Sequence, residues 1–217
     1  AEAVARGARL ETGVSITGWK ERDGEVVVTT DGGVFRAANL ILTPGAWAPG
    51  LLDKLRMPLD VRKKHLYWFR CPEKRYRDSA GFPSFVFETP EGFFYGFPSI
   101  DAESIKVAMH SGGDKVEDPL NIDRGLNEED LAATRDFLAR YLPGVEHDIL
   151  RHEICFYTCT PDEHFILDRY PDSEKVVFAA GLSGHGFKFT SVLGDILACM
   201  SSGTDHGLSI DFLGAGR

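Results

Sequence analysis

The sequence predicts a mixed α/β fold with a large antiparallel part, and three patterns support this class. Short apolar runs that end at glycine, such as residues 176–180, are typical of buried strands. Residues 58–113 are rich in aromatic side chains and broken by turn residues, as in an antiparallel sheet. Residues 127–141 and 191–200 carry apolar side chains at helical spacing. We therefore expect two lobes, one built from both ends of the chain and one from an antiparallel insertion, with a cleft at their junction.

The first fifth of the chain predicts a helix end, a hairpin and an apolar strand. Residues 1–8 are expected to end a helix near Gly7, and residues 9–16 to form a strand. Asp23-Gly24 predicts a tight turn into a strand at 25–30, followed by another at 34–37. The strand at 39–43 ends in a turn that contains Gly45 and Trp47. Such strand ends are where ligands gather in open α/β sheets.

The middle of the chain predicts the antiparallel sheet and one helix. We expect the helix at 127–141 to begin with a capping-box-like pattern at Asn127 and to stop before Pro143-Gly144. The turn at 161–163 separates two further strand-like segments. The predicted strands are residues 64–70, 84–88, 92–97, 104–110, 152–160 and 164–168.

The segment from Gly181 to Thr190 follows a buried strand and opens a helix. Its glycines allow positive φ and close approach of a ligand, and the free N–H groups of the helix start carry partial positive charge. The pattern predicts a site for an electron-rich group, although a plain strand-to-helix turn has the same appearance.

Composition narrows the classes of function. The net charge of -9 argues against a general nucleic-acid binder, and no run approaches the roughly 18 apolar residues of a membrane span. Four cysteines are too few and too scattered for a disulfide framework, and no signal peptide is visible, which favours a cytoplasmic protein. The chain begins without Met inside an apparent helix, which suggests a fragment or a processed product.

The cysteines and histidines allow three interpretations. His152, Cys155, Cys159 and His164 have the side chains of a zinc site, but Cys155 and Cys159 on one strand would lie about 13 Å apart, too far to share a metal. A Cys–His hydrolase pair with Cys155 or Cys159 as nucleophile would need a base that the sequence does not identify. A buried, inert cysteine is the simpler alternative.

Two longer motifs carry a specific resemblance. CFYTCTPDEHF from Cys155 to Phe165 and GLSGHGFKF from Gly181 to Phe189 resemble the C-terminal half of the monomeric sarcosine oxidase and N-methyltryptophan oxidase family of FAD-dependent, D-amino-acid-oxidase-like enzymes. The Pro44–Trp47 turn, the strand with Tyr95 and the pair Lys106 and His110 add to this resemblance. It implies an α/β fold in which part of a glutathione-reductase-like FAD-binding lobe (1–57 and 151–217) joins an antiparallel substrate domain (58–150).

The resemblance also implies roles for individual residues. Cys155 would bond to the 8α-methyl of FAD, and Lys106 would activate oxygen beside the flavin. Tyr95, His110 and Tyr157 would line the substrate cavity, and Lys188 would pair with the substrate carboxylate. An anionic partner would explain a lysine at a helix start, where the dipole disfavours a cation. The remaining residues expected near FAD are Val14, Gly45, Trp47, Gly181, Ser183, Gly184, His185, Gly186, Phe187 and Lys188.

The implied activity is oxidation of the N–CH bond of a secondary amino acid to an imine, with O2 reduced to H2O2. The partners would be that amino acid and O2, with no nucleic acid or membrane, in a monomer or loose dimer. Phe85, Phe87, Tyr95 and Tyr157 suggest a roomy aromatic pocket for a substrate larger than sarcosine.

The chain departs from the family pattern at its start. The Gly-x-Gly-x-x-Gly fingerprint for the FAD pyrophosphate and the arginine that shares the substrate carboxylate are absent. The alternative function is therefore an inactive module that folds or interacts with a missing N-terminal half or another subunit.

Overall fold

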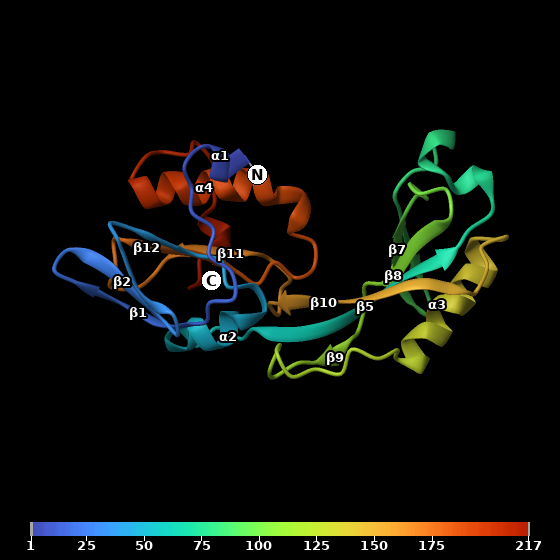
Figure 1. The fold of residues 1–217 in the computed structure, drawn as a ribbon, viewed down its shortest axis with the longest axis horizontal. Helices are drawn as coiled ribbons and strands as arrows, with labels where there is room; N and C mark the ends of the chain where they lie inside the picture. The colour runs from blue at the N-terminus through green and yellow to red at the C-terminus, as the bar shows by residue number, and fades with distance from the viewer. Residues whose placement is uncertain (1, 217) are drawn as a thin grey trace. The chain divides into compact units, whose positions relative to one another are not determined.

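The computed structural model describes residues 2–216, which divide into two compact units. Residues 2–44, Ile166–Ala180 and residues 188–216 form the first unit, and Gly45–Phe165 and Gly181–Phe187 form the second (Figure 1). Both units combine helices with antiparallel strands, so the predicted mixed α/β class is confirmed. No helix within residues 2–216 has the length and apolar character needed to cross a membrane.

The first unit begins with α1 (Glu2–Ala5) and a three-stranded antiparallel sheet of β1 (Ile16–Arg22), β2 (Glu25–Thr30) and β3 (Gly33–Ala37). Asp23 and Gly24 take φ values of 52° and 79°, which confirms the predicted hairpin turn. The strand predicted at 9–16 is wrong. Residues 9–15 are mostly exposed and form no strand, and Gly13 takes φ 68° before β1 begins.

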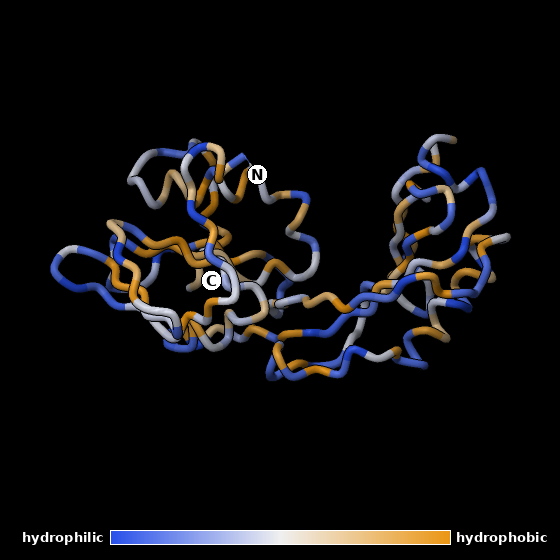
Figure 2. The backbone as a smooth tube through the Cα atoms, viewed as in Figure 1, coloured by the Kyte–Doolittle hydropathy of each residue, from blue (hydrophilic) through white to orange (hydrophobic). Residues whose placement is uncertain are grey.

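The second sheet of this unit has the order β11 (Ile166–Arg169), β12 (Val176–Ala180), β4 (Leu40–Leu42). β12 pairs antiparallel with β11 and parallel with β4. All five β12 residues are buried, because α4 (Thr190–Ser202) packs against β12 and β4. Figure 2 shows β12 as a continuous hydrophobic segment, which is the pattern that predicted a buried strand.

The second unit is organised around a six-stranded antiparallel sheet. Its order is β10–β5–β8–β7–β6, and the short β9 pairs with β5. The strands are β5 (Asp60–Arg70), β6 (Phe85–Thr89), β7 (Gly92–Phe97), β8 (Ser104–Met109), β9 (Asp114–Lys115) and β10 (Ile149–Cys159).

One helix, α3 (Glu128–Tyr141), covers one face of this sheet. The Asn127 side chain accepts hydrogen bonds from the backbone N–H groups of Glu129 and Asp130, both at 3.0 Å, so the predicted cap is confirmed. The buried cluster beneath the helix contains Tyr67, Phe69, Cys71, Tyr76, Phe94, Ile105, Val107, Leu131, Phe137, Leu138, Leu142 and Val145.

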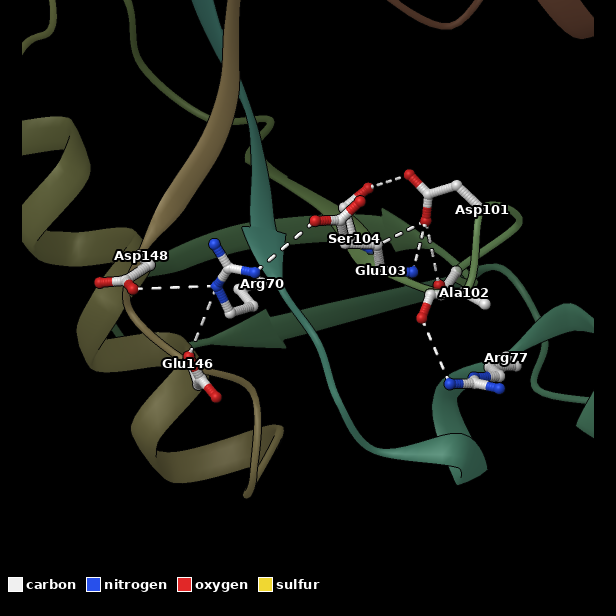
Figure 3. Close-up of polar contacts among 9 residues, drawn as sticks. Arg70, Arg77, Asp101, Ala102, Glu103, Ser104, Glu146 and Asp148 are labelled. Carbon is white, nitrogen blue, oxygen red and sulfur yellow. Dashed lines mark hydrogen bonds and ion pairs between the residues drawn. The ribbon is translucent and has the colours of Figure 1, made fainter.

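A polar network fixes the ends of β5 and β8 (Figure 3). Arg70 lies 3.6 Å from Glu103, 3.8 Å from Glu146 and 3.9 Å from Asp148. Asp101 accepts hydrogen bonds from the Ser104 hydroxyl at 2.6 Å and from its backbone N–H at 2.8 Å. These contacts lie where the end of β5 meets the start of β8 and the segment before β10.

Short helical turns complete the chain. They are η1 (Gly45–Trp47), α2 (Ala48–Leu51), η2 (Asp53–Leu55), η3 (Lys74–Tyr76), η4 (Asp78–Ala80), η5 (Phe187–Phe189) and η6 (Asp211–Leu213).

Candidate active site

The register of the six-stranded sheet separates its side chains onto two faces. Directly opposed residues of antiparallel strands share a face, and successive residues along a strand alternate. Arg151 on β10 opposes Trp68 on β5, which opposes Lys106 on β8, which opposes Phe97 on β7. These four residues therefore share the face opposite α3, which we call the open face.

Lys106 lies on the open face between two aromatic rings. Its Nζ is 5.1 Å from the centroid of Trp68 and 5.2 Å from that of Phe97. Ring faces attract a cation, so the two rings hold the ammonium in place. Burial lowers the pKa of Lys106, and the nearby Cys155 opposes that shift. A half-buried lysine held between rings is unusual for a strand surface, which makes Lys106 a candidate functional residue.

Cys155 lies on the same face, because it is four residues along β10 from Arg151. Burial raises the pKa of its thiol, while the neighbouring Lys106 and Lys64 lower it. The thiol is half-buried and lies 3.7 Å from the Phe156 carbonyl. Two lysines near one sulfur favour the thiolate over what burial alone would give.

Two phenols and an imidazole meet beside this cysteine. The Tyr157 hydroxyl lies 3.4 Å from the Tyr95 hydroxyl and 3.3 Å from Nδ1 of His110. Burial raises the pKa of Tyr157, and the nearby Tyr95 adds to that shift. Both phenols therefore stay protonated at neutral pH and can donate hydrogen bonds. The structure brings together these three predicted residues from β10, β7 and the end of β8.

The glycine segment is fastened to the end of β10. The Ser183 N–H donates to the Thr158 carbonyl at 2.9 Å, and the Ser183 hydroxyl donates to the Gly181 carbonyl at 3.1 Å. Gly184 takes φ 77°, and a Cβ there would lie 2.3 Å from the Tyr157 ring. Only glycine fits so close to that ring, so the contact with Tyr157 restricts position 184 to glycine.

The rest of the glycine segment forms a compact turn. His185 donates its backbone N–H to Leu182 at 3.0 Å, and its Nε2 lies 3.0 Å from the Glu163 carbonyl. A Cβ on Gly186 would lie 2.7 Å from Leu182, so this glycine also permits a close approach. Phe187 is 89% exposed, which is unusual for a large apolar side chain.

Gly45 and Trp47 lie in η1, which also contacts β10. The Thr158 hydroxyl donates to the Gly45 carbonyl at 3.0 Å, and Trp47 is half exposed. Trp47 helps to line a cavity of about 380 Å³ together with Leu59, Lys115 and Asp118. Thr158 therefore contacts both of the predicted glycine turns. Its hydroxyl donates to Gly45, and its carbonyl accepts from the N–H of Ser183.

The first unit holds the two remaining predicted residues. Val14 lies in the irregular segment before β1. Lys188 lies in η5, directly before α4, with its Nζ 5.2 Å from the centroid of the Phe189 ring.

Some sequence-based expectations need correction. Phe85 and Phe87 do not lie with Tyr95, because they pack on the α3 face against Phe137, at centroid distances of 6.5 and 5.4 Å. Strand alternation puts them one residue out of phase with Tyr95, since Tyr95 opposes Val86.

Within residues 2–216, no group of three His, Cys, Asp or Glu side chains is placed to hold a metal.

Sequence reasoning missed Trp68 and Lys64. Trp68 contacts Lys106 and also Arg151, whose guanidinium carbon is 4.6 Å from the ring centroid. Lys64 opposes Cys155. The available signal was the i, i+2 alternation of Lys64, Leu66 and Trp68 on one strand, which becomes informative only with the register.

The open-face residues fit a planar, electron-rich cofactor. The donor set combines a sulfur nucleophile, an ammonium, two phenols and an imidazole, and glycines keep the neighbouring backbone bare. Such groups can hold a flavin-like ring by charge and hydrogen bonds.

Comparison with known proteins agrees with this fit. The family pattern described as FAD dependent oxidoreductase matches residues 1–200. The monomeric sarcosine oxidase of Arthrobacter sp. (strain TE1826) is 38% identical over 213 residues, covering 96% of this chain and 55% of that protein. The N-methyl-L-tryptophan oxidase of Yersinia pestis (strain Pestoides F) is 36% identical over 185 residues, covering 84% of this chain and 48% of that protein.

Solved structures share the fold. NikD, an amino acid oxidase essential for nikkomycin biosynthesis, superposes with a TM-score of 0.82 at 24% identity, covering 98% of this chain and 56% of that one. Glycine oxidase from Geobacillus kaustophilus gives a TM-score of 0.80 at 18% identity, covering 99% and 55%. This chain thus spans about half the length of the curated relatives it matches. It belongs to the FAD dependent oxidoreductase family and resembles the monomeric sarcosine and N-methyl-L-tryptophan oxidases.

Proposed function

We propose that the polypeptide carrying this chain oxidises the N–CH bond of a secondary amino acid to an imine, while O2 is reduced to H2O2. The observation that carries this proposal is the shared open face of Lys106, Cys155 and Tyr157. The amine loses two electrons and two protons, which oxygen accepts as H2O2, so the reaction balances. When bound, FAD supplies the capacity to take up those electrons and pass them to oxygen.

Lys106 would stabilise the reduction of O2, which is the second half of the reaction. Reduction of oxygen builds up negative charge, and a fixed ammonium stabilises charge where it develops. Trp68 and Phe97 hold the ammonium between their rings, so its orientation does not have to be established during the reaction.

Tyr95, His110 and Tyr157 would bind the amino acid. Their hydroxyl and imidazole groups already contact one another, so a substrate amine or carboxylate meets a preformed set of hydrogen-bonding groups. Lys188 would pair with the substrate carboxylate.

Cys155 would hold FAD through its sulfur, and the surrounding backbone would lie against the cofactor. We assign Gly45, Trp47 and residues 181–188 to the flavin end and Val14 to the adenine end. FAD binding would belong to residues 1–57 and 151–217, and substrate binding to residues 58–150. We propose a cytoplasmic monomer or loose dimer with no nucleic-acid or membrane partner.

A peroxide-coupled assay tests the reaction. FAD-loaded protein would be offered sarcosine, N-methyltryptophan, proline and pipecolate, with the corresponding primary amino acids as controls. We expect peroxide with at least one secondary amine. Flavin-loaded protein that gives none with any of them would contradict the proposal and favour an inactive interaction module.

Acid precipitation tests the covalent bond. Yellow colour should stay with the precipitated wild-type protein and be lost to the supernatant in Cys155→Ser. Cys159→Ser is the matched control, because Cys159 lies on the same strand and the same face. Acid-stable colour in Cys155→Ser would show that the sulfur of Cys155 is not the attachment point.

A further inference from the structure

We propose that Lys64 is a positioning residue, which holds the His110 segment and the Tyr157 ring together for substrate binding. This inference rests on the proposed function. Lys64 opposes Cys155 at the candidate site, but it belongs to neither of the two motifs. It is also more deeply buried than lysine usually is.

Lys64 is a buried cation with neutral partners. Only 1% of its surface is exposed, and its Nζ donates to the backbone carbonyls of Ser111 at 2.7 Å and Gly112 at 3.0 Å. Within residues 2–216 it forms no ion pair at 4.0 Å or less. Burial lowers its pKa, and the more distant Asp130 and Cys159 oppose that shift. A buried ammonium costs free energy, and the two carbonyls offset part of that cost.

The two carbonyls belong to the segment that carries His110. The His110 N–H donates to the Phe93 carbonyl at 2.6 Å, and the Phe93 N–H donates to the Ser111 hydroxyl at 3.0 Å. Lys64 therefore links β5 to the end of β8, which is itself linked to β7. Gly113 permits this packing at φ 101°, because a Cβ there would lie 2.6 Å from the Lys63 carbonyl oxygen and 3.0 Å from Lys64 Cδ.

The same ammonium also faces the Tyr157 ring, 5.5 Å from its centroid. Tyr157 in turn meets His110 and Tyr95 through its hydroxyl. One buried charge thus contacts both the backbone that follows His110 and the ring that His110 contacts. Removing it would leave two carbonyls without their donor and the ring without its cation.

Two measurements on Lys64→Met test the inference, because methionine keeps most of the side-chain length and removes the charge and donors. Amide hydrogen exchange of residues 110–113 should speed up about tenfold. In the FAD-loaded protein, KM for the amino acid should rise about tenfold with a smaller change in kcat, as expected when uniform binding is lost. Lys64→Arg, which keeps the charge and the donors, should recover part of both effects.

Lys63→Met is the matched control. Lys63 is the adjacent residue on β5 and points to the other face, where its Nζ pairs with Asp114 at 3.1 Å. It should leave both measurements near wild-type values. Where Lys64→Met does not fold, Lys64→Gln carries the same comparison with an expected change in the same direction.

The outcomes separate the two proposals. Unchanged exchange at residues 110–113, or an equal change in Lys63→Met, overturns the positioning role of Lys64. Faster exchange with an unchanged KM overturns its link to substrate binding. Faster exchange in a protein whose wild type forms no peroxide supports the positioning of His110 and Tyr157 and rejects the oxidase assignment instead.

Discussion

The two faces of the six-stranded sheet differ in what their side chains do. The face under α3 buries Phe69, Phe94, Ile105 and Val107 at 1% exposure or less. On the open face, Lys106 lies between two of those residues along β8 and carries a charge. Strand alternation therefore places a stability residue and a candidate catalytic residue side by side in the sequence. Substitutions on the two faces should have different consequences, which the following experiments examine.

The largest effect on stability should come from Phe137→Ala on the covered side. Phe137 is 3% exposed and stacks on Phe94 at a centroid distance of 4.5 Å. Loss of a buried phenylalanine costs about 3–5 kcal/mol in the free energy of unfolding. Urea titration of the variant measures it. Val86→Ala is the control, since Val86 is 59% exposed on the open side, and an equal loss there would erase the distinction between the faces.

Lys106→Met should have a large effect on the reaction rate and a small effect on stability. Removal of a single charge-stabilising group costs about 10²–10³-fold in rate, so reoxidation of the reduced, FAD-loaded protein by O2 should slow by that factor. The free energy of unfolding should change by less than about 1 kcal/mol, because the lysine is only half-buried. Stopped-flow absorbance measures the rate. Reoxidation at the wild-type rate would remove Lys106 from the oxygen reaction.

Tyr157→Phe should give a smaller change on the open face. The variant keeps the ring and loses the hydroxyl that contacts His110 at 3.3 Å and Tyr95 at 3.4 Å. Loss of one such group corresponds to about 1.4 kcal/mol, which predicts a KM for the amino acid raised roughly tenfold. Steady-state kinetics measures it. Tyr141→Phe is the control, because Tyr141 packs with Phe87 and Phe137 on the α3 side.

The smallest effect should be a pH dependence of stability at Asp101 (Figure 3). Burial would raise the pKa of Asp101, but hydrogen bonds from the Ser104 hydroxyl and from the N–H groups of Ser104 and Glu103 prevail and hold it at about 2, below its ordinary 3.8. The folded-state pKa is depressed. The stabilisation is therefore fully present above pH 3.8 and is lost as the pH falls toward 2.

Asp101→Asn should therefore be less stable than wild type at neutral pH, by about 1 kcal/mol, and the difference should shrink between pH 4 and 2. Thermal unfolding of both proteins across this range measures it. Asp78→Asn, at a nearby exposed position, is the control variant. A difference that stays constant down to pH 2 would mean that the carboxylate charge does not contribute.

Much of the fold follows from local patterns. The turn at Asp23-Gly24 and the Asn127 cap each depend on neighbours within a few residues, which turn and capping rules describe well. The continuous apolar run of β12 predicts a buried strand, although distant elements bury it. The strand predicted at 9–16 is wrong, since residues 9–15 pair with no strand among residues 2–216 and are mostly exposed. An extended pattern without a pairing strand is not stable by itself.

The candidate site was less accessible to sequence reasoning. Motif resemblance pointed to Lys106 and Cys155, but Trp68 and Lys64 have no motif, and their faces depend on the register of β5 with β8 and β10. Phe85 was placed on the wrong face for the same reason, since a shift of one residue reverses a strand.

Peroxide turnover per folded, FAD-loaded molecule, measured side by side for Lys106→Met and Phe137→Ala, tests the division between the faces most directly. We predict a fall of about 10²-fold or more for Lys106→Met and turnover near the wild-type value for the folded fraction of Phe137→Ala. Equal losses in the two variants would contradict the assignment of catalysis to the open face.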